Sequence, residues 1–200
     1  MDEMRSNTRR RGDALTESVY DAVLELIKEV GYVNLTFQQI AKAAKTSRTV
    51  LYRRWETTFD LILEIMEYRT SKALGGRLID KIENTGTLRG DLLRLLTLYQ
   101  GIYAEVGLEI MNVFLFEMGE NNAKISVIET TAKTKNIMVM RKLFGFAKAR
   151  GDKINGVSDI TLTLPFNLIR MDNFMYKNVV DASRIELLVD EILLPVFTAK

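Results

Sequence analysis

Apolar residues recur at helical spacing along almost the whole chain, and this periodicity constrains the fold more than any other feature of the sequence. Its first run comprises Leu15, Val19, Ala22, Val23, Leu26, Ile27 and Val30. Residues three, four and seven positions apart share one face of a helix, so this spacing is typical of a helix that buries that face. No segment of useful length alternates apolar and polar residues as a half-buried strand would, and the sequence has only 2 Pro. We therefore predict an all-α protein.

The apolar runs predict about nine helices in total. Their approximate ranges are 13–30, 37–44, 47–54, 57–74, 88–106, 108–118, 122–149, 158–178 and 183–197. Gly75-Gly76 and residues 84–87 are the best linker candidates, because clusters of Gly, Asn and Thr favour turns and loops. Pro165 falls inside the eighth predicted helix, where its missing N–H is expected to kink the helix or to mark its tight first half.

Neither Cys nor His occurs in the chain. Their absence excludes disulfides, zinc sites built from Cys and His, Fe–S clusters and every nucleophilic mechanism that needs a His base. A metal site would have to rely on carboxylates, and an enzymatic reaction on a carboxylate pair or on Ser and Lys. The Asp and Glu residues are scattered, mostly over the polar phases of the predicted helices. We expect no cofactor and no metal. An all-helical enzyme that works with carboxylates stays open as an alternative.

The sequence shows no targeting or membrane segment. The first twelve residues, MDEMRSNTRRRG, are polar, and no apolar core of a signal peptide follows them. The longest apolar stretches fall far short of the ~18 residues that a transmembrane helix needs. A chain without cysteine suits a reducing compartment, so we expect a cytoplasmic protein with no membrane partner.

Positive charge is concentrated in the first quarter of the chain. Residues 1–56 hold ten Lys and Arg against eight Asp and Glu, whereas residues 57–200 hold eighteen of each kind. The densest basic cluster comprises Lys42, Lys45, Arg48, Arg53 and Arg54. Such a cluster is either an ordinary solvated face or an electrostatic footprint for the phosphates of a nucleic acid.

Residues 36–55 contain two short predicted helices joined by a tight turn. Thr36 and Gln39 fit a capping box, in which each side chain bonds the backbone of the other at a helix start. Ser47 offers a second cap soon afterwards. Two short helices in this order form a helix-turn-helix, whose second helix lies in the major groove of DNA. An apolar seam that can lock the two helices together comprises Phe37, Ile40, Ala41, Ala44, Val50, Leu51 and Trp55.

Polar residues of the same segment are candidates for DNA contacts. Ser47, Arg48 and Thr49 open the second short helix, from which side chains reach base edges. The remaining candidates would bind phosphate. The predicted DNA-binding set is Thr36, Lys45, Thr46, Ser47, Arg48, Thr49, Tyr52 and Arg53. Arg54 is a further phosphate candidate, but at least one of the two adjacent arginines is expected to face solvent or to pair with an acidic residue.

The segment TFQQIAKAAKTSRTVLYRRW, preceded by a helix that ends in GY and followed by TTFDL, resembles the DNA-binding region of the TetR/AcrR family of bacterial transcriptional regulators. The resemblance implies a three-helix DNA-binding domain in residues 12–72, with the helix-turn-helix at about 36–55. It implies a larger helical domain for ligand binding and dimerisation in residues 73–200. It also implies a homodimeric repressor that leaves its operator DNA when a small hydrophobic molecule binds. By position, Thr36 and Tyr52 match residues that contact the DNA backbone in the family.

Two residues depart from the family pattern. Lys45 stands where a turn glycine is usual, and Thr58 stands where a phosphate-binding lysine is common. A turn glycine usually serves a backbone with positive φ, which costs a residue with a side chain about 1–2 kcal/mol. Either Lys45 accepts this strain because its ammonium group lies near a phosphate, or the turn has a different geometry in which a lysine is unstrained.

The C-terminal part of the chain is rich in methionine and aromatic residues, and residues 88–200 hold six of the 9 Met. Such side chains at helical spacing usually form a core, but they also line pockets that adapt to varied ligands. The candidate ligand-binding residues are Tyr103, Met111, Phe114, Met118, Met138, Phe166 and Met171. Their implied partner is a small-molecule effector. A DNA-binding protein without a specific effector is the alternative.

The last predicted helix has an apolar stripe wide enough for a partner as well as for its own core. The stripe comprises Ile185, Leu188, Val189, Ile192, Leu193, Val196 and Phe197. By the resemblance, the last two helices would pair with those of a second copy of the chain. An internal helix of a monomer is the alternative.

Overall fold

The computed structural model describes residues 2–176 and 180–198, with side chains from Ala14 onward except that of Tyr176. Helices dominate these residues and no strand occurs among them; an isolated β-bridge joins Ile154 and Thr198. The prediction of an all-α protein is confirmed. The chain forms two compact units, residues 1–68 and residues 69–200.

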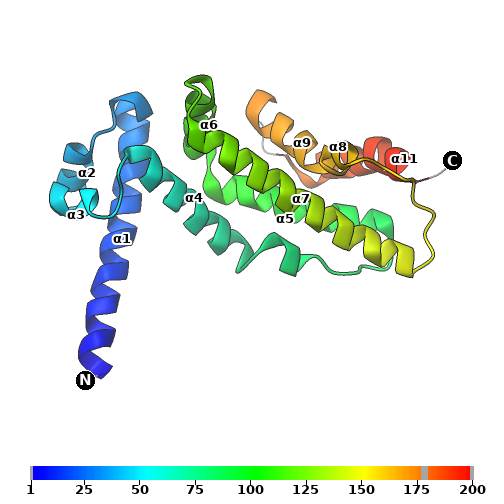
Figure 1. The fold of residues 1–200 in the computed structure, drawn as a ribbon, viewed down its shortest axis with the longest axis horizontal. Helices are drawn as coiled ribbons and strands as arrows, with labels where there is room; N and C mark the ends of the chain where they lie inside the picture. Colours follow the sequence, from blue (N-terminus) through cyan, green and yellow to red (C-terminus); the bar gives the residue numbers. More distant parts are fainter. Residues whose placement is uncertain (1, 177–179, 199–200) are drawn as a thin grey trace. The chain divides into compact units, whose positions relative to one another are not determined.

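The described part of the first unit contains four helices and one short 3-10 turn (Figure 1). They are α1 (Asp2–Val30), η1 (Tyr32–Asn34), α2 (Phe37–Ala43), α3 (Arg48–Tyr52) and α4 (Thr58–Leu74), whose last residues belong to the second unit. The predicted start of the first helix near residue 13 is wrong, because the polar residues ahead of the apolar stripe are compatible with a helix and extend it.

Each helix of the first unit contributes side chains to one apolar core. The fully buried members include Val23 of α1, Ile40 of α2, Leu51 of α3 and Ile62 of α4. α3 is only 5 residues long, and isolated helices shorter than ~12 residues are marginal in water. Packing against this core, rather than its own hydrogen bonds, therefore sets the position of α3.

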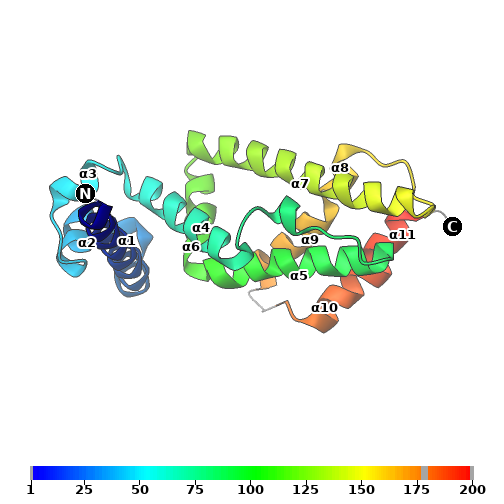
Figure 2. The ribbon, with the colours of Figure 1, turned by 90° about the horizontal axis from the view of Figure 1, so that it is seen from below.

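The second unit has three longer helices followed by a series of short helical segments. The longer helices are α5 (Leu88–Val106), α6 (Leu108–Gly119) and α7 (Ala123–Ala149), and the 3-10 segment η2 (Leu78–Lys81) precedes them. The short segments are α8 (Asp159–Leu162), α9 (Leu164–Met171), η3 (Asp172–Tyr176), α10 (Ala182–Leu187), η4 (Leu188–Leu193) and α11 (Leu194–Phe197). α5 and α7 run in opposite directions, and α9 packs on α5 (Figure 2).

The C-terminal segments are interrupted near a proline, as the sequence predicts. The eighth predicted helix is divided at Thr163, and Pro165 occupies the first turn of α9, where its missing N–H leaves no helical hydrogen bond unmade. The predicted end of this helix, at residues 177–178, lies outside the described residues. Two π-helical segments, η3 and η4, follow α9 and α10. The sequence does not predict these two π-helical segments, because the one extra residue in a π-helical turn leaves the spacing of apolar residues almost unchanged.

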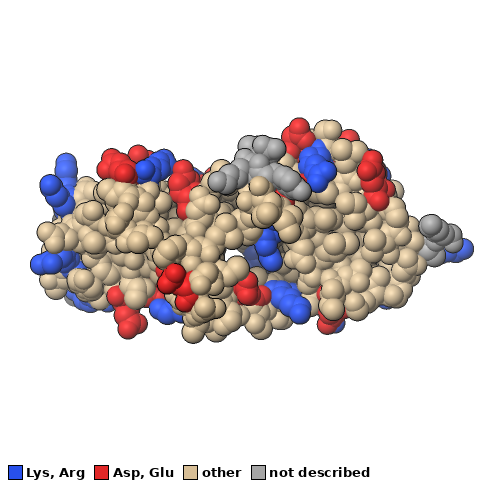
Figure 3. All heavy atoms as spheres, turned by 90° about the horizontal axis from the view of Figure 1, so that it is seen from above, with Lys and Arg blue, Asp and Glu red and all other residues tan. Residues whose placement is uncertain are grey.

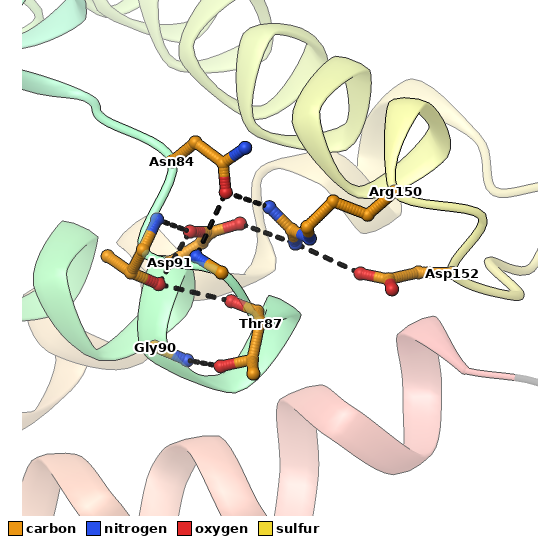
Figure 4. Close-up of polar contacts among 8 residues, drawn as sticks. Asn84, Thr87, Gly90, Asp91, Arg150 and Asp152 are labelled. Atoms are coloured by element: carbon orange, nitrogen blue, oxygen red, sulfur yellow. Dashed lines mark hydrogen bonds and ion pairs between the residues drawn. The ribbon is translucent and has the colours of Figure 1, made fainter.

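One end of the second unit is held by a buried ion pair (Figure 4). The carboxylate of Asp91, in the first turn of α5, accepts a hydrogen bond from Arg150 at 2.8 Å. It also accepts from the backbone N–H and the hydroxyl group of Thr85, at 2.8 and 2.7 Å. Arg150, directly after α7, pairs with Asp152 as well and donates to Asn84. We name these five residues the Asp91 clamp; it ties the loop before α5 to the end of α7.

Metal-binding and membrane-spanning features are absent from the described residues. No three of their acidic side chains gather as metal ligands would. Among the described helices none is long and apolar enough to cross a membrane. Several acidic groups pair with basic ones instead, as in the exposed ion pairs Arg77–Asp80 and Arg141–Asp159.

Candidate nucleic-acid interface

The first short helix of the helix-turn-helix, α2, begins with a complete capping box. The hydroxyl oxygen of Thr36 accepts from the backbone N–H of Gln39 at 3.3 Å, and Gln39 Oε1 accepts from the backbone N–H of Thr36 at 2.8 Å. The Thr36 hydroxyl group also donates to Gln39 Oε1 at 2.7 Å. The predicted capping box is confirmed. A phosphate contact by this hydroxyl group would compete with its bond to Gln39.

The turn between α2 and α3 places Lys45 in the left-handed backbone region, with a φ of 50°. The backbone N–H of Thr46 donates to the Ala41 carbonyl at 2.9 Å, and that of Lys45 to the Lys42 carbonyl at 3.4 Å. This pattern usually ends a helix with glycine at the left-handed position. The alternative of an unstrained lysine is therefore wrong. The Lys45 side chain is exposed, and its contact with phosphate stays a prediction.

The start of α3 presents three exposed polar side chains, Ser47, Arg48 and Thr49. Ser47 Oγ accepts from the backbone N–H of Val50 at 3.3 Å and so caps the helix. The Ser47 hydroxyl group can still donate outward, because a hydroxyl both accepts and donates. Leu51, on the opposite side of the helix, is fully buried.

The end of α3 adds Tyr52 and Arg53 to the same exposed face, since each lies four residues after a residue of the first turn. Tyr52 is 60 % exposed, yet its ring meets the edge of the Phe37 ring with the centroids 4.8 Å apart. This contact anchors the tyrosine on α2. Arg53 is exposed. We name Lys45, Ser47, Arg48, Thr49, Tyr52 and Arg53 the α3 face.

Arg54 is engaged within the first unit. Its guanidinium group donates to the Thr16 hydroxyl at 2.7 Å, pairs with Glu64, and lies 4.7 Å from the centroid of the Trp55 ring. Glu64 of α4 also accepts from Trp55 Nε1 at 2.8 Å and from the Tyr20 hydroxyl at 2.6 Å. The prediction that one of the two arginines pairs with an acidic residue is confirmed for Arg54. We name these five residues the Glu64 network; it joins α1, α4 and the segment that follows α3.

The Glu64 network favours one protonation state. Burial alone would raise the pKa of Glu64, but hydrogen bonds from Tyr20 and Trp55 and the charge of Arg54 outweigh it, so this pKa lies below its ordinary value. Burial, and next to it the Glu64 carboxylate, raises the pKa of Tyr20 well above its ordinary value. A neutral phenol therefore donates to an ionised carboxylate over a wide pH range.

Sequence reasoning finds Arg54 but misses Glu64 and Tyr20, which complete the network. Glu64 lies on an amphipathic helix that carries other acidic residues, so its charge does not single it out. A weak signal was available, because Tyr20 adjoins Val19 and Glu64 adjoins Ile65, both core residues. Polar residues at the border of two apolar stripes can meet when the stripes pack together.

In the second unit, the structure brings some predicted ligand-binding residues together. Tyr103 of α5 and Phe166 of α9 are buried, and Tyr99 joins them. The centroid of its ring lies 5.4 Å from that of Tyr103 and 5.0 Å from that of Phe166. Met111 of α6 is buried and Phe114 is half-buried.

The other three predicted ligand-binding residues lie at the surface of the second unit. Met118, Met138 and Met171 are 44, 52 and 54 % exposed. They occupy the solvent-facing phases of α6, α7 and α9, whereas Met140 of α7 is fully buried. The structure therefore does not bring these three residues into the interior with Tyr103 and Phe166.

Comparisons with known proteins agree with this geometry. The family model described as "Bacterial regulatory proteins, tetR family" matches residues 19–65, which contain the helix-turn-helix. An uncharacterized HTH-type transcriptional regulator of Mycobacterium tuberculosis is 28% identical over 178 residues, 88% of this chain and 84% of the relative. A TetR transcription regulator from Haloarcula marismortui has a TM-score of 0.70 at 16% identity and covers 92% of this chain and 98% of its own. The SmeT–triclosan complex has a TM-score of 0.64 at 14% identity, with coverages of 94% and 93%.

A short polar helix, exposed on one side and packed on a second short helix on the other, is the arrangement of a helix-turn-helix. The match to the family model and the similarity to an HTH-type regulator over most of the chain narrow the class of protein further. The match of residues 19–65 to the family model and the 28% identical HTH-type relative support a transcriptional regulator of the TetR type. Members of this family are regulators, which rules out the alternative of a carboxylate-based enzyme.

Proposed function

We propose that the protein is a homodimeric, cytoplasmic repressor that binds operator DNA through the α3 face and leaves it when a small hydrophobic molecule binds the second unit. The α3 face carries the DNA part of this proposal, because its basic and hydroxyl side chains are exposed while Leu51 anchors the helix in the core. The SmeT structure is a complex with triclosan, which supports a small apolar effector for a protein of this fold.

We assign different tasks to two arginines of the α3 face. Arg48 lies in the first turn of α3, from which side chains reach base edges, and it would bind a guanine edge. Arg53 follows the helix and would bind phosphate. Lys45, Thr46 and Tyr52 would add phosphate contacts, and Ser47 and Thr49 would border the bases read by Arg48.

Substitution of the two arginines tests this division of tasks. Operator fragments are first selected from random DNA with the purified protein. Arg48→Ala should then cost about 1–3 kcal/mol of binding free energy and relax the preference at one base pair. Arg53→Ala should weaken binding to all sequences alike and reduce the salt slope by about one. Arg77→Ala, which removes an exposed arginine of the second unit, is the control and should change neither quantity. If the two phenotypes are exchanged, our assignment of the helix face is wrong.

Exposed apolar side chains on the C-terminal segments support a homodimer. Ile160 of α8, Met171 of α9, Met175 of η3 and Leu187 of α10 are 77, 54, 68 and 46 % exposed. Large apolar side chains gathered at a surface often mark a protein–protein contact. A two-fold pair of α3 helices would bind half-sites about 34–36 Å apart, or a multiple of that distance, on a pseudo-palindromic operator.

Sedimentation of a charged variant tests the dimer. The double variant Ile160→Glu, Met171→Glu should be monomeric at concentrations at which the native protein is dimeric, because both substitutions bury charge in the proposed contact. Its affinity for the full operator should fall to that for a half-site. Met138→Glu, which alters an equally exposed methionine of α7, should leave the dimer intact. A native protein that sediments as a monomer and binds a half-site as tightly as the operator would contradict the proposal.

A further inference from the structure

A partly buried arginine of the second unit has no carboxylate partner among the residues that the structure describes. Arg170 lies in the last turn of α9, and only part of its side chain reaches solvent. Within the described part of the chain, no Asp or Glu forms an ion pair with it, and no carboxylate contributes to its electrostatic environment.

Several other arginines of the second unit are paired with acidic residues, whereas the half-buried Arg69 donates to the backbone carbonyl groups of Glu105 and Val106. Arg184 binds Asp172 through two nitrogen atoms, at 2.7 and 3.1 Å, and Arg89 binds Asp190 in the same way. A cation taken partly out of water is costly unless an anion compensates it. The missing anion at Arg170 is therefore a feature that stability does not explain.

Two phenols of α5 face Arg170, and its guanidinium group also donates to Asn167 Oδ1 at 3.5 Å. Tyr99 and Tyr103 both interact electrostatically with its guanidinium group. Burial raises the pKa of Tyr103 well above its ordinary value, so this phenol is neutral and its hydroxyl group can donate a hydrogen bond. The cluster offers a guanidinium group and two hydroxyl groups, and it has a positive charge that no protein group in the described chain neutralises.

A buried amide pair fixes the backbone beside this cluster. Asn173 Nδ2 donates to Gln100 Oε1 at 2.7 Å and to the Ile169 carbonyl at 2.8 Å, and Gln100 Nε2 donates back to Asn173 Oδ1 at 3.3 Å. These amide groups satisfy one another, so they hold η3 against α5. η3 is π-helical and follows Arg170 directly; π-helical turns are frequent at functional sites.

The surroundings of the cluster are aromatic and partly open. Phe166 packs against Tyr99, and Phe174 lies with its ring centroid 6.1 Å from that of Tyr103. Figure 3 shows a hollow in the face of the molecule seen from above, and Lys or Arg atoms lie in it. Apolar walls around one polar anchor are typical of a small-molecule site.

We propose that Arg170, together with Tyr99 and Tyr103, anchors an organic carboxylate with an apolar body, and that this anion is the effector of the repressor. A guanidinium group matches the two oxygen atoms of a carboxylate with parallel hydrogen bonds, and the aromatic rings would enclose the apolar body. A neutral hydrophobic effector would leave the Arg170 charge uncompensated. This inference rests on the proposed function and narrows its effector to one chemical class.

The test compares acids with their own amides, which have the same shape without the charge. The melting temperatures of the native protein and of Arg170→Met are measured alone and with phenylacetate or phenylacetamide, and with hexanoate or hexanamide. We expect Arg170→Met to melt at the native temperature or above, because methionine removes the uncompensated charge. We expect an acid, but not its amide, to stabilise the native protein, and Arg170→Met to bind that acid about tenfold or more weakly.

Two further variants separate the anchor from a general loss of charge. Tyr103→Phe keeps the ring and removes the hydroxyl group, so it should weaken binding of the acid less than Arg170→Met does. Arg141→Met removes an exposed arginine of α7 that pairs with Asp159, and it should respond to the acid as the native protein does.

Three results would overturn the carboxylate site. One is a clearly lower melting temperature of Arg170→Met, which would show that Arg170 serves stability, for example by pairing with a carboxylate of a second copy. Another is equal stabilisation by acids and amides. The third is a native protein that responds to none of the acids.

Operator release distinguishes this failure from a failure of the proposed function. If a neutral compound releases operator DNA from both the native protein and Arg170→Met, the repressor function stands and the carboxylate site is rejected. If the native protein binds no selected operator at all, the proposed function itself fails, whatever the acids do.

Discussion

The two units use charge in opposite ways. In the Glu64 network of the first unit, the side chains of Arg54 and Glu64 keep 47 and 32 % of their surface exposed. In the Asp91 clamp of the second unit, the carboxylate has no exposed surface and the arginine only 15 %. Water screens the first pair, whereas removal of one partner from the second leaves a charge in a poorly hydrated site. The first unit therefore uses charge to orient α3, and the second uses it to hold distant segments together.

The largest effect is expected at the clamp. Asp91→Ala should destabilise the second unit by about 3–5 kcal/mol, because it leaves Arg150 buried without its main partner. Urea unfolding followed by circular dichroism measures this loss. Asp80→Ala removes the partner of the exposed Arg77 and should cost less than about 1 kcal/mol. Equal effects of the two substitutions would show that burial does not separate the two kinds of ion pair.

A smaller and pH-dependent effect is expected in the first unit. Glu64→Gln keeps the shape of the side chain and removes its charge, which should cost about 1–2 kcal/mol of unfolding free energy at pH 7 and lower the affinity for operator DNA. The pKa of Glu64 is lowered by folding, so its contribution is complete above the ordinary pKa of 4.5 and is lost as the pH falls through the lower value in the folded protein.

Urea unfolding of the native protein and of Glu64→Gln at several pH values tests this pH dependence. The native protein should be more stable than Glu64→Gln at neutral pH, and the two should converge as the solution is acidified below pH 4.5. A difference that grows on acidification would mean that the charged form of Glu64 is not the stabilising one.

The smallest effect is expected at the turn between α2 and α3. Lys45→Gly should raise the unfolding free energy by up to about 1 kcal/mol by relieving the positive φ, less the part that a more flexible unfolded chain takes back. If Lys45 binds phosphate, the same variant should bind DNA more weakly at low salt than at high salt, relative to the native protein. If the glycine variant is less stable and has an unchanged salt slope, then Lys45 neither strains the turn nor binds phosphate.

The features of the first unit that could be predicted from the sequence are local. Thr36 and Gln39 lie three residues apart and form the expected capping box, and Thr57 and Asp60, at the same spacing, form another; the hydrogen bonds are 2.8–3.3 Å long. A cap depends on residue types at fixed spacing, so the sequence contains all the information that it requires. The turn at Lys45 is different: the glycine usual at this position in the family indicates a left-handed backbone, but the lysine left a second geometry open until the structure showed a φ of 50°.

The features that escaped prediction depend on packing between distant segments. Asp91 and Arg150 lie 59 residues apart, and neither the charge pattern nor the helical period pairs them. When a helix is apolar on several sides, the sequence does not show which side faces the core. For this reason Met138 was a candidate for the interior of the second unit, although Met140 is the residue that is buried there. Arg170 was missed for a related reason, since a lone arginine near the end of an amphipathic helix usually faces solvent.

The Glu64 network has a consequence for spectroscopy. The chain has 1 Trp, and Trp55 is buried with its indole N–H on Glu64 and the Arg54 guanidinium group over its ring. Its fluorescence therefore reports on the first unit alone, from a residue close to the end of α3. Far-ultraviolet circular dichroism, by contrast, is dominated by the larger second unit. Without any label, the two signals recorded on one sample show whether the units unfold together, and a shift in tryptophan emission would reveal an effector whose binding is felt at the DNA-binding helix.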